Sequence, residues 1–478
     1  MLDFLWILFL IYIGLTIIVL ILERRNPTST LAWILVLILV PFAGFLAYLL
    51  FGRNISKKKI FPIAESEKAR ILELVKAQGE FLKIGEMGDQ DPAIDHHMSL
   101  IQMNLNGARA IFSKDNEVEI FIDGQEKFTR LLAGIRQARQ QIHMEYFIVK
   151  DDALANHLID LLIEKSLEGV RVCFLVDFLG SRIPGRRFKQ MKAAGIHVAK
   201  FFPAKFFPYF DITLNHRNHR KIVVIDAQEA YLGGFNVGNE YLGLDSRKGA
   251  WRDTHILVRG SAVLEIQNRF LLDWRASGGK QEDLDRLSFP KTQGHGDVGM
   301  QIVSSGPESQ MEQIKYAYLS MIHQARKSIL IQSPYFIPDE AMIDALKMAL
   351  LRGVEVSITI PNKPDHLFVY WATYSYIGDL LPFGLHAYIY EKGFMHAKTM
   401  VVDAEVFSCG TANFDIRSFK LNFEINAFIY DQDIAQEYVA IYHRDLLHSR
   451  QLTLLDYQNR PWMIKIKEPV SRLLSPLL

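Results

Sequence analysis

The most apolar part of the chain is its N-terminal end, where two long hydrophobic runs follow each other closely. Residues 2–22 are interrupted only by Asp3, and residues 31–51 contain no charged side chain. At about 1.5 Å per residue, a helix of either length crosses a hydrocarbon core of about 30 Å. A cleaved signal peptide does not fit the first run, because no basic segment precedes it and a second run follows at once. The pattern predicts a two-helix transmembrane hairpin.

The basic residues around these runs favour one orientation of the hairpin. Glu23, Arg24 and Arg25 occupy the short loop between the runs, whereas Arg53 and the lysines at 57–59 follow the second run. An excess of Lys and Arg marks the cytoplasmic side of a membrane protein. We therefore expect a multi-pass membrane protein whose N-terminus and downstream body are cytoplasmic.

Beyond a polar connector with one amphipathic helix near residues 66–81, the pattern of apolar positions occurs twice. In each copy a helix end runs into a buried strand, and an amphipathic helix is then closed by glycine and followed by a β-rich run. Alternation of this kind predicts an α/β fold of two similar halves, in which helices flank mixed β-sheets. The paired segments are residues 138–149 with 325–337, and residues 157–176 with 341–360.

Composition agrees with a multidomain protein that has a full hydrophobic core. The 478 residues are 49% hydrophobic and 22% charged, and the formal net charge is only +1. Nucleic acid is not expected as a partner, because its phosphates require a strong basic excess. Cys173 and Cys409 lie in apolar runs and are expected to be buried thiols. The expected segments are a membrane hairpin (1–59), a connector (60–107), a first half (108–276), a linker (277–299), and a second half with the C-terminal tail (300–478).

One polar motif occurs in both halves: His-x-Lys, four residues, Asp, six residues, Gly, two residues, Asn. The copies lie in residues 218–236 and 395–413. Two copies with five fixed positions each are not explained by chance. The first contains His219, Lys221, Asp226, Gly233 and Asn236, and the second contains His396, Lys398, Asp403, Gly410 and Asn413.

Strand geometry indicates which motif side chains point the same way. Side chains two residues apart on a strand share a face, so each motif His shares a face with its Lys. Asp226 and Asp403 follow at an odd offset. Although the motif groups them with the catalytic residues, we expect their carboxylates to hold the backbone of the strand or turn in place. A returning strand then brings Asn236 and Asn413 back beside the His and Lys.

Two such halves around one pocket suit phosphodiester chemistry. One His can attack phosphorus while the other protonates the leaving oxygen. The Lys and Asn side chains can stabilise the charge on the phosphoryl oxygens. A zinc site is the rival interpretation, but each Lys would repel the cation and the usual His-x-x-x-His spacing is absent from both motifs. There is no Walker A sequence, so nucleotide use is not indicated. With the zinc site also disfavoured, we expect neither a metal nor another cofactor.

The two motifs resemble those of the phospholipase D superfamily, and the surrounding sequence is similar to the bacterial cardiolipin synthases over essentially the whole chain. The resemblance implies two halves related by a pseudo-twofold axis, one active site at their interface, and a location in the bacterial cell membrane. The segments that carry it are ERRNPTSTLAWILVLILVPFAGFLAYLLFG, NHRNHRKIVVID, GGFNVGNEYLG, QSPYFIPD and FDIRSFKLNFEIN.

The resemblance also implies a reaction. By analogy, His219 displaces glycerol from one phosphatidylglycerol and holds the phosphatidyl group as a phosphohistidine. His396 protonates that glycerol, then activates the hydroxyl of a second phosphatidylglycerol, which gives cardiolipin without ATP. The expected partners are therefore phosphatidylglycerol and other membrane phospholipids. A homo-oligomer is compatible with the sequence.

Members of the superfamily orient each His with a carboxylate further along the chain. Glu424, 28 residues after His396, matches as its partner, and Asp253 is then the expected counterpart for His219. Many members carry Ser after the motif Gly, whereas the first copy here has Gly234 and the second has Thr411. The two halves are therefore expected to be unequal near the phosphate.

Two other segments could contact lipid. Residues 201–210, FFPAKFFPYF, contain six aromatic side chains, which suit either core packing or a wall for acyl chains. Residues 472–478 could also touch the membrane.

Other functions remain open from the sequence. A phospholipase D-type hydrolase has the same catalytic residues and uses water as acceptor, and another phosphatidyltransferase would also share them. A nuclease is disfavoured by the near-neutral charge. A non-catalytic membrane scaffold is disfavoured because both His-x-Lys pairs are intact.

Overall fold

The computed structural model of the chain falls into two compact units, which are described separately. One comprises residues 1–58 with 202–216, and the other comprises residues 59–201 with 217–478. The structure describes residues 6, 9, 12–14, 17–18, 27–40, 43–45, 48, 60–61, 65–84, 92–201, 216–245, 249–279, 294–363 and 365–475.

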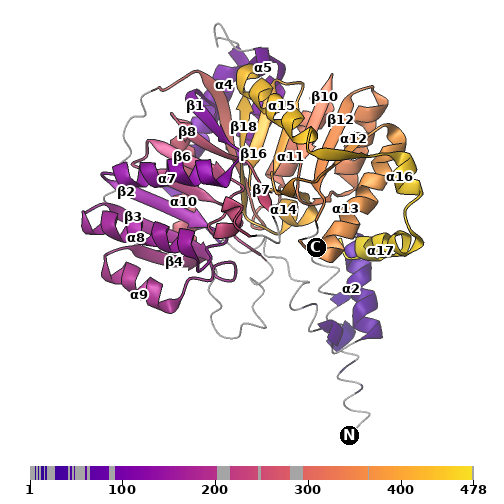
Figure 1. Cartoon of the computed structure of the whole chain (residues 1–478), viewed down its shortest axis with the longest axis horizontal. Helices are drawn as coiled ribbons and strands as arrows, with labels where there is room; N and C mark the ends of the chain where they lie inside the picture. The colour runs from indigo at the N-terminus through magenta and orange to yellow at the C-terminus, as the bar shows by residue number, and fades with distance from the viewer. Residues whose placement is uncertain are drawn as a thin grey trace. The chain divides into compact units, whose positions relative to one another are not determined.

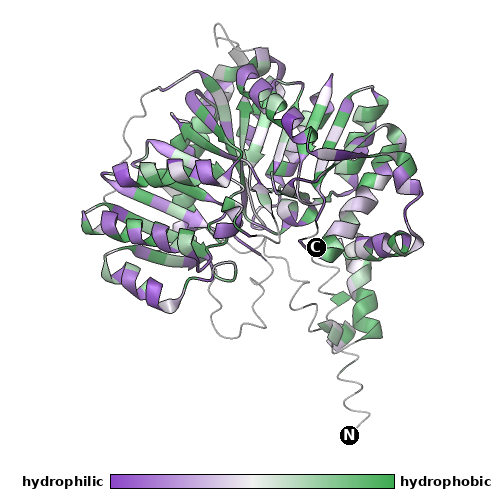
Figure 2. Ribbon diagram, in the orientation of Figure 1, coloured by the Kyte–Doolittle hydropathy of each residue, from purple (hydrophilic) through white to green (hydrophobic). Residues whose placement is uncertain are grey.

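The smaller unit contains helix α2 (Pro27–Leu39), in which every residue from Leu31 to Leu39 is apolar (Figure 2). Leu37 of this helix and Tyr48 are buried together in a small cluster. Most of the first predicted span and a third of the second lie outside the described residues, as do residues 53 and 57–59. Among the helices that the structure describes, none has the combined length and apolarity needed to cross a bilayer.

The larger unit is built on one continuous mixed sheet of 15 strands. The first half of the chain supplies one side and the second half the other, and they meet where β1 pairs with β9 in antiparallel fashion (Figure 1). First-half strands, from this junction outward, are β1 (Ser113–Phe121), β8 (His255–Arg259), β6 (Glu229–Gly233), β5 (Ile222–Ile225), β2 (Gln141–Tyr146), β3 (Arg171–Asp177) and β4 (His197–Phe201). Second-half strands are β9 (Val298–Ser305), β18 (Glu424–Tyr430), β16 (Val406–Gly410), β15 (Thr399–Val402), β10 (Ser328–Gln332), β12 (Glu355–Pro361), β13 (His386–Tyr390) and β19 (Ser449–Leu452).

The two halves have the same strand order from the junction outward, with β19 as an addition to the second. In each half the predicted motif strand pairs antiparallel with a returning strand, β5 with β6 and β15 with β16. Further out, β2–β3–β4 and β10–β12–β13 are parallel. The expectation of two similar α/β halves with a mixed sheet is confirmed.

Local sequence explains why the matching helices begin and end where they do. The carboxylate of Asp152 accepts a hydrogen bond from Ala155 N at the start of α8 (Ala153–Leu167), and Asp339 does the same at the start of α12 (Glu340–Leu351). The predicted closing residues Gly169 and Gly353 have φ of 96° and 83°. This left-handed conformation ends a helix and is readily adopted only by glycine.

Helices cover both faces of the sheet and bury its apolar side chains. One cluster of buried residues lies in each half, and a third joins strands of both halves to α10 and α15. The predicted connector helix is α4. Besides α8 and α12, the helices and short 3₁₀ segments of the larger unit are α4 (Glu65–Ile84), α5 (Pro92–His96), α6 (Met98–Ala108), α7 (Gly124–Gln137), α9 (Gly185–Ala193), η3 (Asn239–Leu242), α10 (Ala262–Ala276), α11 (Gln313–Gln324), α13 (Leu367–Leu380), η5 (Leu381–Phe383), α14 (Ile416–Lys420), α15 (Gln432–Leu446), α16 (Leu454–Gln458) and α17 (Trp462–Leu473).

Candidate active site

The two motif histidines line a single pocket of about 720 Å³ in the larger unit. His219 and His396 each lie just before a central strand, in a segment that is bonded to the opposite half. His219 N donates to Phe423 O at 3.0 Å, and His396 N donates to Arg252 O at 2.7 Å. Beside His396, the short strands β14 (Gly393–Met395) and β7 (Ala250–Arg252) also pair across the halves. Each motif segment therefore crosses to the other half before its own strand begins.

The carboxylate partners are exchanged relative to the prediction. Nδ1 of His219 lies 2.9 Å from Oε2 of Glu424, and Nδ1 of His396 lies 2.5 Å from Oδ2 of Asp253. The predicted pairs, Glu424 with His396 and Asp253 with His219, are therefore wrong. The reason is the crossing of the motif segments. Asp253 lies just before β8 and Glu424 at the start of β18, and these two strands flank the junction, so that each carboxylate meets the motif of the opposite half.

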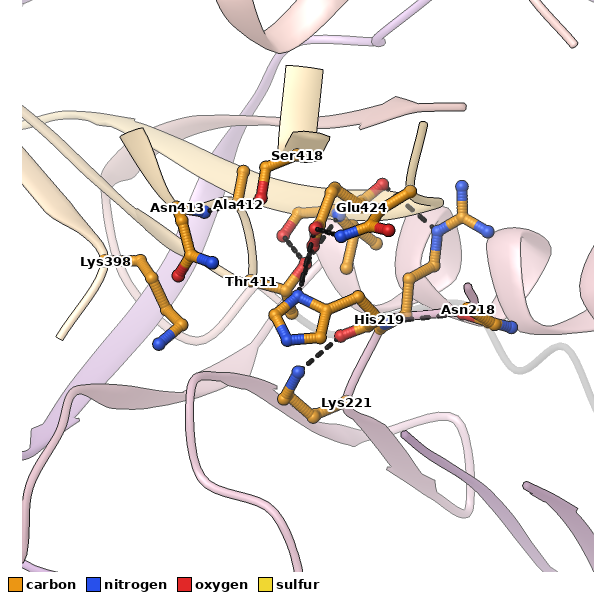
Figure 3. A network of polar contacts seen from close by, with 12 residues as sticks. Asn218, His219, Lys221, Lys398, Thr411, Ala412, Asn413, Ser418 and Glu424 are labelled. Atoms are coloured by element: carbon orange, nitrogen blue, oxygen red, sulfur yellow. Dashed lines mark hydrogen bonds and ion pairs between the residues drawn. The ribbon is translucent and has the colours of Figure 1, made fainter. Parts of the chain in front are cut away.

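Both lysines are buried beside their own histidines. Lys221 Nζ donates to His219 O at 2.5 Å, and Lys398 Nζ donates to His396 O at 2.5 Å. Lys398 Nζ also lies 2.9 Å from Nδ1 of His396. Figure 3 shows Lys221 below the His219 ring and Lys398, from the other half, to the left of it. Two lysine amines thus lie beside the histidines that line the pocket.

Burial determines the protonation of this cluster. It lowers the pKa of Lys221 to about 7 and that of Lys398 to about 8, against the attraction of the nearby carboxylates. Burial, together with Lys398, lowers the pKa of His396 to about 4. Burial also lowers the pKa of His219, although Glu424 opposes this. Both imidazoles are therefore neutral near pH 7.

The carboxylates remain charged despite their burial. Burial alone would raise their pKa values, but Lys398 and His396 hold the pKa of Asp253 below its usual value. His219 and Lys221 do the same for Glu424. A charged carboxylate on Nδ1 leaves Nε2 of each ring as the nitrogen available for chemistry.

The motif asparagines both line the pocket. Asn236 is held by its neighbours, because Oδ1 accepts from Ile148 N at 3.1 Å and Nδ2 donates to Tyr241 Oη at 3.0 Å. Oδ1 of Asn413 is buried and has no hydrogen-bond partner among the described residues.

The motif aspartates hold backbone and do not reach the pocket. Asp226 accepts hydrogen bonds from the N–H groups of residues 139, 140 and 141, and Asp403 from those of residues 326, 327 and 328, all at 2.7–2.8 Å. Both have positive φ, 52° and 55°. Neither is among the described residues that line the pocket. Their grouping with the catalytic residues is corrected: they anchor the turn after each motif strand.

The unequal residues after the motif glycines have a steric explanation. A Cβ on Gly234 would lie 1.9 Å from Oδ1 of Asp253, so only glycine fits beside that carboxylate. In the second half, the Thr411 hydroxyl instead donates to Glu424 at 2.5 Å (Figure 3). In the first half, the carboxylate of Asp253 therefore occupies the space that a side-chain hydroxyl at position 234 would need.

Sequence reasoning missed the buried ion pairs that support the crossing segments. Arg220 Nη1 lies 2.8 Å from Oδ1 of Asp273, and its other nitrogens donate to backbone oxygens of the second half. Arg252 Nε lies 2.9 Å from Oδ2 of Asp445 in a similar position. The only signal in the sequence is that both arginines adjoin site residues, and their partners are far away in the chain.

Other predicted features lie outside the site or outside the described residues. Among the described residues, no group of three or more His, Cys, Asp or Glu side chains is placed to hold a metal ion. That catalysis needs no metal remains a prediction. Cys173 and Cys409 are buried free thiols, as expected. Phe201 is buried against Phe423, whereas residues 202–210 and 476–478 lie outside the described residues.

Known proteins resemble the chain along its entire length. It is 51% identical over 472 residues to the major cardiolipin synthase ClsA of Bacillus subtilis (strain 168), with 98% of each chain covered. It is 46% identical to a cardiolipin synthase of Oceanobacillus iheyensis, again with 98% of each covered. Among solved structures, a phosphatidylserine synthase from Haemophilus influenzae Rd KW20 has the same fold, with a TM-score of 0.59, 15% identity, and coverage of 79% of this chain and 96% of that one.

Family profiles match the same regions that the fold delimits. The profile described as "Cardiolipin synthase, PLD-like domain" matches residues 131–269 and 318–446, one match in each half. A second, described as "Phospholipase D-nuclease N-terminal", matches residues 4–53. The chain belongs to the cardiolipin synthase family of the phospholipase D superfamily.

Proposed function

We propose that the chain transfers a phosphatidyl group from one phosphatidylglycerol to another, giving cardiolipin and glycerol through a phosphohistidine. The main supporting observation is that His219 and His396 line one pocket, each with Nδ1 on a buried carboxylate. Two imidazoles oriented in this way can act in turn on one phosphorus. Membership of the cardiolipin synthase family agrees with this reaction.

In the first step, Nε2 of His219 attacks the phosphorus of the donor lipid. The N–P bond forms as the bond from phosphorus to the glycerol oxygen breaks, and that oxygen takes a proton from Nε2 of His396. The lowered pKa of His219 supports its role, because a nucleophile must be neutral. The lowered pKa of His396 implies that the bound phosphodiester anion helps it to carry the proton.

In the second step, the acceptor replaces glycerol at the same place. His396 takes the proton of its free hydroxyl, the new O–P bond forms, and the N–P bond to His219 breaks. One phosphodiester is exchanged for another, so the overall reaction needs no nucleotide. Microscopic reversibility requires the same acid and base in both steps.

Lys221, Lys398, Asn236 and Asn413 are the proposed groups that stabilise charge on the phosphoryl oxygens. The two asparagines line the pocket and each lysine amine contacts its own histidine. Loss of one such donor typically costs about 10²–10³ in rate. Asp253, Glu424 and Thr411 are positioning residues that act through the imidazoles. Asp226 and Asp403 support the motif turns.

A lipid substrate fits the apolar rim of the pocket. Leu179 and Phe368 line it and are 52% and 54% exposed, so apolar surface is available there to acyl chains. We further propose that residues 1–59 form the membrane hairpin, with the catalytic body cytoplasmic and the halves related by a pseudo-twofold axis. The apolar runs and the family match over residues 4–53 support a membrane anchor. A homo-oligomer is compatible with this arrangement.

The direct experiment uses purified full-length protein with phosphatidylglycerol alone, in detergent micelles, and separates the products by mass spectrometry. Cardiolipin and glycerol in equal amounts are expected. Phosphatidic acid without cardiolipin would mean that water is the acceptor and that the chain is a hydrolase. Unchanged lipid with both the wild type and His219→Ala would favour a scaffold without catalytic activity.

A further inference from the structure

The pocket is not symmetric in charge, although the motifs are duplicated. Two residues before the first motif histidine stands Arg217, and the same position in the second half is Phe394. Two residues before the carboxylates stand Asn422 and Trp251. Phe394 and Trp251 pack together, with ring centroids 5.0 Å apart, beside His396. At these two matched positions the residues beside His396 are therefore aromatic, whereas those beside His219 are polar.

The position four residues after the motif asparagine strengthens this difference. In the second half it is Arg417, and in the first half it is Glu240. Glu240 forms an ion pair with Lys150 at 2.7 Å, so the charges of these two residues cancel. Both residues line the pocket. Arg217 and Arg417, which come from opposite halves, lie near each other at one end of the pocket, where Asp177 faces Arg217 and Asp415 faces Arg417.

Arg217 is buried without a full set of partners. It is 8% exposed, and its Nη1 has no hydrogen-bond partner among the described residues. The nearest oxygen of Asp177 lies 3.7 Å away, beyond hydrogen-bond distance. Asp177 itself already accepts from the backbone N–H groups of residues 179, 180 and 218. A buried guanidinium nitrogen without a partner is costly, and the Arg217 side chain lines the pocket, where an anionic ligand can offset that cost.

The two arginines lie within electrostatic reach of each other. Burial lowers the pKa of Arg217; Asp177 opposes this, and Arg417 adds to it. An anion placed between two guanidinium groups relieves their repulsion and accepts hydrogen bonds in the geometry that arginine favours. Phosphodiesters are anions of this kind.

We propose that Arg217 and Arg417 form a second anion subsite, which holds the phosphodiester of the acceptor lipid while its hydroxyl reaches the phosphohistidine. Asn422, at the same end of the pocket, contributes polar contacts to the acceptor headgroup. This inference rests on the proposed function. The subsite is separate from Lys221 and Lys398, which surround the phosphoryl group being transferred.

The chemistry of the acceptor explains why such a subsite is needed. The free hydroxyl of phosphatidylglycerol is separated from its own phosphate only by the carbons of one glycerol. The acceptor phosphate must therefore enter the pocket beside a phosphoryl group that is already anionic. Two like charges in a buried site repel strongly without counter-charges. A hydrolase, whose acceptor is water, has no use for the second pair of cations.

The test compares two acceptors in one reaction mixture. Wild type, Arg217→Gln and Arg417→Gln are each given phosphatidylglycerol in micelles with isotopically labelled glycerol, and cardiolipin and labelled phosphatidylglycerol are quantified together. Both products use the same donor step, but only cardiolipin formation needs an acceptor with a phosphate. The ratio of cardiolipin to labelled phosphatidylglycerol should fall about 10- to 100-fold in either variant. Arg326→Gln, at an exposed side chain outside the pocket, should keep the wild-type ratio.

Further variants and competitors keep the result interpretable. Arg217→Lys retains the charge and should recover part of the ratio, which a misfolded protein would not do. An equal loss of both products would place the arginines on the donor and overturn the subsite, as would an unchanged ratio. Inorganic phosphate is the competitor. If it inhibits cardiolipin formation by the wild type but not by Arg217→Gln, and the product ratio is the same in both, then the subsite takes free phosphate and not the acceptor lipid. If the wild type makes phosphatidic acid and no cardiolipin, the proposed function itself fails.

Discussion

Nδ1 of His219 lies 2.9 Å from Oε2 of Glu424, which is 205 residues further along the chain and in the opposite half. Asp253 stands in the same relation to His396. Each imidazole is thus oriented by a carboxylate that its own half does not supply. Neither half alone contains a complete catalytic histidine, so the two halves must fold together for either to function.

The crossed pairs predict which variants affect which chemical step. A phosphatidyl ester of p-nitrophenol needs no acid to release its weakly basic leaving group. With this donor, Asp253→Asn and His396→Ala should still release a burst of nitrophenolate as the phosphohistidine forms. Glu424→Gln should slow the burst about 10²–10⁴-fold, and His219→Ala should abolish it. Stopped-flow absorbance measures both burst rate and amplitude.

The opposite result would exchange the two roles. If His219→Ala keeps the burst and His396→Ala loses it, then His396 is the nucleophile and His219 the acid. A single His→Ala variant that retains half of the turnover on phosphatidylglycerol would mean two independent sites.

The close packing of Gly234 against Asp253 predicts a second effect. Gly234→Ala places a Cβ 1.9 Å from Oδ1 of Asp253, so the carboxylate must move away from His396. Cardiolipin formation should fall about 100-fold, because the acid–base group loses its orientation. Gly185→Ala is the matched control: nothing lies within 4 Å of its added Cβ, and it should leave activity and thermal stability nearly unchanged. Equal activity of the two variants would disprove this role of Gly234.

Local pattern predicted the parts of each half but not how the halves meet. Apolar periodicity, the closing residues Gly169 and Gly353, and the returning strand after each motif were all readable from the sequence, because they depend on neighbours in the chain. The odd offset of Asp226 and Asp403 likewise indicated that they support the turn. These features require no knowledge of distant contacts.

The pairing of carboxylates with histidines could not be obtained in this way. Spacing placed Glu424 with His396, the nearer histidine in sequence, whereas the β1–β9 junction brings the start of β18 to the other motif. The buried pair of Arg220 with Asp273 was missed for the same reason. Contacts between halves depend on the packing of the whole sheet, which periodicity does not encode.

The positive charges in the site predict that catalysis does not depend on a metal ion. Lys221 and Lys398 occupy the positions where a divalent cation would neutralise the phosphoryl oxygens. After treatment with a chelator and extensive dialysis, cardiolipin formation in neutral micelles should stay within about twofold of the untreated rate, apart from headgroup screening. Sodium chloride at matched ionic strength controls for screening. A large loss restored by one particular divalent ion, and not by salt, would contradict this prediction.

Burial of Lys221 predicts that this lysine lowers the free energy of unfolding of the protein. Its pKa is about 7 in the folded protein and has the ordinary value of 10.5 when unfolded, so between these values the unfolded chain binds the extra proton. The destabilisation is complete below pH 7 and disappears as the pH rises towards 10.5.

Lys221→Met should therefore abolish activity yet raise the free energy of unfolding by about 1–4 kcal/mol at pH 6, and by less at pH 9. Thermal unfolding in detergent, followed by tryptophan fluorescence, measures the difference at both pH values. Lys392→Met changes an exposed lysine and should show no such pH-dependent gain in stability. A lower melting temperature for Lys221→Met at both pH values would show that Lys221 stabilises the fold instead.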